Sequence, residues 1–250
     1  MSKIRKLLIL PMVALSLAIV ACSSTPPVSS IADMASFSDV KAEKKALVLM
    51  ANSGQPCEES AFEFQNTSTQ EIVEMEIIQR GRARGFSVGQ PAMVTMEPGE
   101  YKIISGNCAS HPYQTIFYSD IEKWFKPFQV QGGDVKFLGN LQVSAAKGEG
   151  RQGIVNAVTG RLLNLGLSTN KPTDYIVLKT LDAPSSAKLA LRTNYPDLLE
   201  DFVSAPLEAR IDAAKFREIV AAAYSLDETG KAPLKSDAHK NVRKYIDSFN

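Results

Sequence analysis

Short segments in which apolar and polar residues alternate constrain the fold of this chain more than any other feature. They recur between residues 44 and 182, where 61–65 and 72–77 alternate and 46–50 forms a compact apolar run. A period of two residues is typical of a β-strand that buries one face. The same texture predicts further strands at 92–96, 101–104, 114–118, 126–131, 135–143 and 175–180.

Turn residues separate these segments. The polar run 66–69 favours a turn between two of the strands. Pro98 suits the first central position of a tight turn and Gly99 the second, which predicts a hairpin between 92–96 and 101–104. Many short strands with turns between them favour an antiparallel β-sandwich over a parallel sheet.

Helical patterns begin after Asp182. Residues 183–194 suit one helix, with Asp182 or Ser185 near its N-cap. Two later segments, 207–223 and 237–249, each carry an apolar stripe at helical spacing.

These patterns together define the expected architecture. The predicted fold class is mainly β with C-terminal helices (α+β), an antiparallel β-sandwich at 43–182 followed by a helical segment at 183–250. The sequence leaves open whether the helices pack on the sandwich or form a separate subdomain.

The N-terminus combines a basic start, an apolar run and a cysteine. Lys3, Arg5 and Lys6 precede the apolar stretch 7–20, and Ala21 precedes Cys22. The run Ile-Val-Ala-Cys that ends at Cys22 resembles the lipobox of bacterial lipoprotein precursors. The resemblance implies a signal peptide at 1–21, a diacylglyceryl group on the Cys22 sulfur, and a membrane attachment through that lipid.

A polar, proline-containing segment follows the lipidation signal. Ser23-Ser-Thr-Pro-Pro opens the range 22–42, whose composition predicts a tether rather than a core. Lipoproteins of this class that stay in the inner membrane carry aspartate after the lipid cysteine, whereas this chain has Ser23. The resemblance therefore implies an outer-membrane protein that faces the periplasm.

Lipidation of Cys22 would leave two cysteines, Cys57 and Cys108. The oxidising compartment that the resemblance implies favours a disulfide between them. Such a bridge closes a loop of about 50 residues and stabilises by about 4 kcal/mol in the chain-entropy model. The alternative is a reactive Cys57 thiol near His111, which its acidic neighbours Glu58 and Glu59 disfavour.

Charge and composition exclude several classes of function. The chain has 28 Lys and Arg against 27 Asp and Glu, and loss of the three basic residues at 1–21 leaves 25 against 27. This balance argues against nucleic-acid binding. With 2 histidines and no ligand spacing, the sequence predicts no metal and no other cofactor.

Two segments suggest binding surfaces. Arg80, Arg82 and Arg84 fall on one face if the strand at 72–77 continues, and this face suits phosphate, carboxylate or an acidic partner. A solvated strand edge is the alternative for the arginines. The aromatic residues at 124–128 suit either a glycan- or peptide-contacting surface or, by their apolar area, the core.

The sequence favours a non-enzymatic binding or scaffolding role with an envelope protein or a glycan as partner. One alternative is a cell-wall hydrolase, because Ser38 and Lys41 match S-x-x-K, 105–107 matches S-x-N, and 179–180 begins K-T-G. Leu181 stands where that third motif requires glycine. A second alternative is a lipid or lipopolysaccharide carrier.

Overall fold

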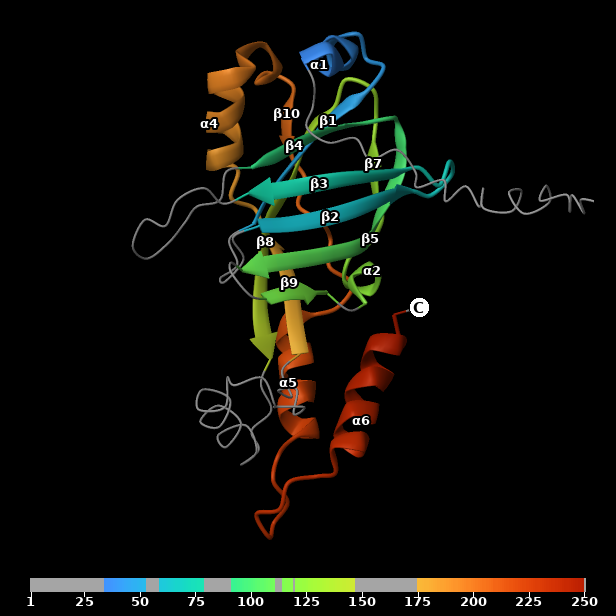
Figure 1. Cartoon of the computed structure of the whole chain (residues 1–250), viewed down its shortest axis with the longest axis vertical. Helices are drawn as coiled ribbons and strands as arrows, with labels where there is room; N and C mark the ends of the chain where they lie inside the picture. Colours follow the sequence, from blue (N-terminus) through green and yellow to red (C-terminus); the bar gives the residue numbers. More distant parts are fainter. Residues whose placement is uncertain are drawn as a thin grey trace, which may run out of the picture.

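The structure is a computed structural model that describes residues 34–52, 59–78, 91–110, 114–118, 120–146 and 175–249. The described strands form two five-stranded sheets, A and B. In the view of Figure 1, α1 and α4 lie at the top of the molecule, and α5 and α6 lie at the bottom. Each strand that the sequence predicts is present.

Sheet A has the strand order β10-β8-β1-β4, and β9 also pairs with β8. The strands are β1 (Ala46–Asn52), β4 (Ala92–Met96), β8 (Val135–Ala146), β9 (Tyr175–Leu181) and β10 (Phe202–Ser204). β1 and β10 run parallel to β8, whereas β4 and β9 pair antiparallel with their neighbours. The prediction of an antiparallel arrangement is therefore wrong for sheet A. Parallel neighbours need a long crossover, and the connection from β1 to β8 includes β4 of sheet A and all the strands of sheet B.

Sheet B has the order β3-β2-β5-β6, and β7 also pairs with β5. The strands are β2 (Glu59–Asn66), β3 (Ile72–Ile78), β5 (Gly99–Ser110), β6 (Gln114–Phe117) and β7 (Phe128–Val130). Every pairing in this sheet is antiparallel. The predicted turn at 66–69 is confirmed, and Asn66 Oδ1 accepts the backbone N–H groups of Ser68 and Thr69 at 2.9 and 3.0 Å.

The predicted hairpin at Pro98 and Gly99 is wrong, because β4 and β5 belong to different sheets. β4 pairs with β1, and β5 pairs with β2, β6 and β7. The turn instead carries the chain from sheet A to sheet B. Gly99 has φ 155°, and a Cβ there would lie 2.6 Å from Asn66 Nδ2, so both the backbone and the close approach favour glycine.

The two sheets share a hydrophobic core. Val48 and Met50 of β1 contribute to it from sheet A, and Phe62, Phe64 and Tyr101 contribute from sheet B. All five are fully buried. Phe216 of α5 (Ala213–Ala223) and Val242 of α6 (Lys235–Asp247) extend the same cluster, so both helices pack against the sheets that form it.

A second core covers the other face of sheet A. Leu47, Leu49 and Ala51 of β1 belong to it, whereas the alternate residues of β1 face the first core. Helices α1 (Met34–Lys41), α4 (Ser185–Asn194) and η1 (Pro196–Leu198) cover this face. β1 is consequently buried at every position, which explains its continuous apolar run.

The helices are not confined to the C-terminal part of the chain. The composition of 22–42 predicts a tether, but α1 lies within this range and its Phe37 and Val40 are buried in the second core. The one-turn helix α2 (Ile121–Trp124) lies between β6 and β7. The predicted order of sandwich and then helices is therefore wrong in detail, since α1, α2 and α4 precede the last strand, and that strand, β10, lies within the predicted helical range 183–250 and pairs with β8.

The predicted helices at 183–194 and 207–223 begin later than expected, as α4 and α5, whereas the one predicted at 237–249 begins at Lys235, as α6. α5 starts at Ala213, where Asp212 Oδ1 accepts the N–H groups of Ala214 and Lys215, and Ile211 is buried ahead of the helix. α4 has no side-chain cap, and Asp182 instead accepts a hydrogen bond from Ser204 Oγ at 2.5 Å. Within the described ranges, no helix combines the length and the hydropathy needed to cross a membrane.

An ion-pair network joins α6 to α2. Lys123 Nζ donates to Asp247 Oδ1 at 2.8 Å, and Arg243 donates to Asp120 Oδ2 at 2.7 Å. The hydrogen bond from Lys123 holds the pKa of Asp247 below its ordinary value, and Arg243 adds to the effect. These four side chains, which we call the α2–α6 clip, fix the last helix to the sheets.

Candidate functional site

Six of the candidate site residues lie outside the described residues. This holds for Cys22, Cys57, His111 and the arginines at 80, 82 and 84. Cys108 lies in β5, where its backbone is in register with Ser60 of β2, and its side chain is not described. The disulfide, the lipidation and the arginine contact therefore remain predictions.

The hydrolase-like motifs lie on three separate elements. Ser38 and Lys41 are in α1, 105–107 is in β5 of sheet B, and 179–180 is in β9 of sheet A. Lys41 Nζ donates to Asp197 Oδ2 at 2.6 Å, and Thr180 Oγ1 donates to the Leu207 carbonyl at 2.8 Å. The side chains of Lys41 and Thr180 thus form hydrogen bonds to separate parts of the structure and do not meet in one site.

His239 takes part in an aromatic cluster. Its Nδ1 lies 2.7 Å from the Tyr175 hydroxyl, which lies 3.4 Å from the Tyr224 hydroxyl. Burial raises the pKa of the Tyr175 hydroxyl. The cluster connects β9, α5 and α6, and among the described residues no group of His, Cys, Asp and Glu is arranged to hold a metal ion.

The aromatic segment at 124–128 belongs mainly to the core. Trp124 and Phe125 are 2% and 4% exposed, and the Trp124 ring packs edge-on against Phe216 at 5.1 Å between centroids. A glycan-contacting surface made by these two rings is therefore excluded. Lys126 and Pro127 lie at the surface and line a cleft; they stand between Phe125 and Phe128 in the sequence.

Backbone hydrogen bonds assemble this cleft from distant parts of the chain. The Lys126 N–H donates to the Glu208 carbonyl and the Arg210 N–H donates to the Trp124 carbonyl, both at 2.8 Å. Phe125 and Ala209 form an isolated antiparallel bridge between the same two segments. The resulting open cleft has a volume of about 670 Å³ and is lined by Glu100, Lys126, Pro127, Ala209, Arg210 and Phe249.

The charges of the cleft differ in how they are paired. Lys126 Nζ forms an ion pair with Glu208. The half-buried Arg210 donates from Nη1 to the Phe249 carbonyl at 3.3 Å, and within the described part of the chain it has no carboxylate partner. Glu100 accepts hydrogen bonds from Thr67 Oγ1 at 3.1 Å and Gln129 Nε2 at 3.4 Å, and no described cation pairs with it.

A second candidate surface is the outer face of sheet B. Ser60, Phe62 and Phe64 of β2 point inward, so the residues between them point outward. In the register of β2 and β3, Glu63 stands opposite Glu74 and Ala61 opposite Glu76. We call the outward carboxylates of these strands, Glu59, Glu63, Glu74 and Glu76, the acidic face.

The acidic face carries negative charge that no cation among the described residues pairs with. None of its four carboxylates forms an ion pair with any other described residue, Lys102 of the adjacent β5 included. Partial burial raises the pKa of Glu74, and the neighbouring Glu76 and Glu63 raise it further. Like charges directly opposite each other destabilise a sheet, so this arrangement is held at a cost in stability.

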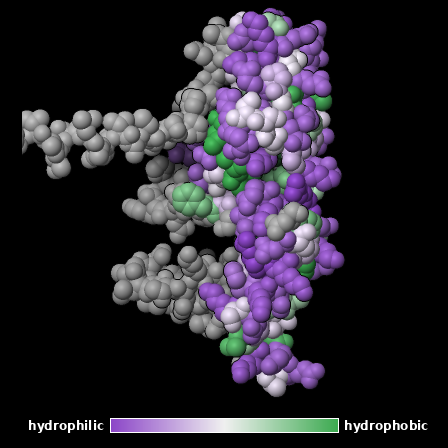
Figure 2. Space-filling view, turned by 90° about the vertical axis from the view of Figure 1, so that its right-hand side faces the viewer, coloured by the Kyte–Doolittle hydropathy of each residue, from purple (hydrophilic) through white to green (hydrophobic). Residues whose placement is uncertain are grey.

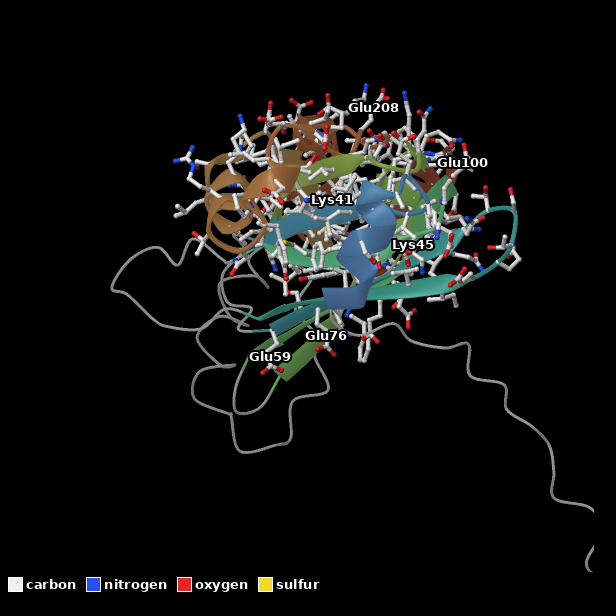
Figure 3. The ribbon with its side chains drawn as sticks, turned by 90° about the horizontal axis from the view of Figure 1, so that it is seen from above. Lys41, Lys45, Glu59, Glu76, Glu100 and Glu208 are labelled. Carbon is white, nitrogen blue, oxygen red and sulfur yellow. The ribbon has the colours of Figure 1, made fainter. Side chains whose placement is uncertain are left out.

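The cleft and the acidic face lie on opposite sides of the molecule. Glu59 and Glu76 lie on one side and Glu100 and Glu208 on the other (Figure 3). The view in Figure 2 shows a largely hydrophilic surface with small, scattered hydrophobic patches. On that side, contacts with a partner would be mainly polar.

Sequence reasoning missed both surfaces. The acidic face could have been predicted from the sequence, because the alternation in 61–65 and 72–77 and the turn at 66–69 together place Glu63 opposite Glu74. The cleft had no local signal, since its lining comes from positions 100, 126–127, 209–210 and 249.

Comparison with known proteins gives no family assignment. No protein-family model and no curated protein matches the chain. Among solved structures, a leucine-rich repeat protein from Bacteroides thetaiotaomicron aligns with 43% of this chain and 14% of its own, at 11% identity and a TM-score of 0.28. A likeness of this size does not indicate a shared fold or function.

Proposed function

We propose that this chain is a lipid-anchored binding or scaffolding protein of the bacterial cell envelope, without enzymatic activity. Its anchor is the lipid on Cys22, and its folded part faces the periplasm from the outer membrane. The order of basic residues, apolar stretch, Ala21 and Cys22 supports the anchor. The two packed sheets, arranged as a β-sandwich, serve as a rigid support for contact surfaces.

The acidic face is the observation that carries the binding role. A partly exposed sheet face whose carboxylates have no cationic partner among the described residues favours a partner with positive charge. Such complementarity accelerates association and selects against acidic partners. We therefore favour a basic envelope protein over a neutral glycan as the partner.

A disulfide between Cys57 and Cys108 would strengthen the end of this surface. Ser60 is in register with Cys108, and Cys57 precedes Ser60 by three residues, which span roughly 10 Å at most in an extended chain. The bridge would join the start of β2 to β5. Arg80, Arg82 and Arg84 follow β3 in sequence and are retained as a proposed contact for phosphate or carboxylate groups.

The anchor is tested by fractionation of cells that express Cys22→Ala. We expect the variant to lose its association with the outer membrane and to escape signal-peptide cleavage at residue 21. Unchanged membrane fractionation would contradict the lipid anchor.

The contact surface is tested by site-specific photo-crosslinking in intact cells. A photo-reactive amino acid at Ala61, on the acidic face, should give a discrete crosslinked product. The control position is Leu189 of α4, which is 62% exposed and does not belong to the acidic face. Equal products at both positions, or none at Ala61, would count against the proposed surface.

A further inference from the structure

The cleft between β5, the start of β7 and the C-terminal residues holds two opposite charges that are both unpaired. Arg210 has no carboxylate partner and Glu100 no cationic partner among the described residues, and the two do not pair with each other. Two opposite charges that line one open cleft without pairing with each other can each bind a group of a ligand.

The other charges of the cleft do not compete for this role. Lys126 is neutralised by its ion pair with Glu208. Among the described residues that line the cleft, Arg210 is therefore the cation without a carboxylate partner, and Glu100 is the carboxylate without a cationic partner. Because Glu208 already balances Lys126, the lining charges that no described residue pairs amount to one of each sign.

Both free groups are held in place by neutral hydrogen bonds. The Arg210 backbone is fixed by its bond to the Trp124 carbonyl, and its guanidinium by the Phe249 carbonyl. Guanidinium has five N–H donors, so most remain for a planar acceptor such as a carboxylate. Each oxygen of Glu100 accepts one hydrogen bond and retains capacity for an ammonium group.

We propose that this cleft binds a zwitterionic ligand of the class of short peptides with free termini. The carboxylate of the ligand binds Arg210, its ammonium group binds Glu100, and its apolar part lies against Pro127 and Phe249. The volume of about 670 Å³ lies within the range of small-molecule sites and suits a peptide of a few residues. This site is independent of the acidic face and lies on the other side of the molecule.

The test uses full-length protein purified in detergent and four forms of one peptide. Trialanine carries both terminal charges, its N-acetyl form the carboxylate alone, its C-terminal amide the ammonium alone, and the doubly blocked form neither. Binding is measured by calorimetry and by NMR shifts of the Arg210 side chain. We expect trialanine to bind at millimolar concentration, and each blocked form to bind about tenfold more weakly.

Substitutions assign each terminus to its residue. Arg210→Gln should weaken trialanine about tenfold but leave the C-terminal amide unaffected, because that form has no carboxylate to lose. Glu100→Gln should also weaken the binding of trialanine about tenfold, but it should leave the binding of the N-acetyl form unaffected, because that form has no ammonium group. Arg192→Gln and Glu122→Gln, which change exposed residues elsewhere, serve as matched controls, and thermal unfolding verifies that each variant is folded.

Three results would overturn the proposal. They are the absence of trialanine binding, equal binding of all four forms, and equal sensitivity of charged and blocked peptides to the two substitutions. Each leaves the acidic-face proposal untouched, because that surface is tested by crosslinking at a separate position.

Discussion

The two sheets of this protein differ in how their faces are covered. Sheet A is packed on both faces, by sheet B on one and by α1, α4 and η1 on the other. Sheet B is packed on one face and leaves the acidic face open. Sheet A, which is covered on both faces, therefore contributes to the stability of the fold. Sheet B, which is covered on one face, presents the charged surface that we propose for contact with a partner.

Acidic residues follow the same division. In the α2–α6 clip, Asp120 and Asp247 are paired with Arg243 and Lys123, and these pairs hold two elements together. On the acidic face the carboxylates have no described partner and repel each other. The charge of the clip is paired, whereas the charge of the proposed contact surface is not paired with any described residue.

Alanine substitutions in β1 and β2 should give the largest contrast. Leu49→Ala and Met50→Ala, on opposite faces of β1, should each cost about 2–5 kcal/mol of unfolding free energy, because both residues are fully buried. In β2, Phe62→Ala should cost about 3–5 kcal/mol and Glu63→Ala less than about 0.5 kcal/mol. Denaturant titrations measure all four, and a small cost for Leu49→Ala would contradict the second core.

Acid should weaken the α2–α6 clip. The folded-state pKa of Asp247 lies below its ordinary value of 3.8, so the stability it adds is complete above that value and is lost as pH falls through the lower one. Asp247→Asn should lower the Tm at neutral pH by roughly one or two degrees and match the parent in strong acid. Asp201→Asn, at an exposed site outside the clip, is the control, and a pH-independent difference would count against the account.

Glu74 should show the opposite dependence at smaller size. Its folded-state pKa is raised, so its ionised form is unfavourable in the fold, and this cost disappears as pH falls below the ordinary value of 4.5. Glu74→Gln should therefore stabilise the protein by a few tenths of a kcal/mol at neutral pH and by nothing in acid. Thermal unfolding across pH measures the gain, and destabilisation at neutral pH would show that Glu74 has a favourable partner.

The strands could be predicted from sequence because their signal is local. Alternation located β2 and β3, and the polar turn between them fixed their pairing. The strand that pairs with β1 could not be predicted, because its parallel neighbour β8 is distant in sequence. The apolar run of β1 does not indicate which strand lies beside it. The run itself is typical of burial on both faces, which would have required a covering layer such as α1 and α4.

Other differences have equally specific causes. The N-cap residue Asp212 marks the start of α5 better than the apolar stripe does. The stripe begins at Leu207, which is buried ahead of the helix. α1 was missed because Phe37 and Val40 are sparse apolar anchors in a polar segment. The cleft depends on tertiary contacts between four segments, and no local pattern could reveal it.

The central claim, that the acidic face is the contact surface, is tested most directly by removing its charge. In cells carrying the photo-reactive amino acid at Ala61, glutamine at the four positions Glu59, Glu63, Glu74 and Glu76 should abolish the crosslinked product. A matched variant with glutamine at the exposed positions Glu122, Glu200, Glu218 and Glu228 removes the same charge elsewhere and should retain it. A product that persists in the first variant, or that disappears equally in both, would contradict the account.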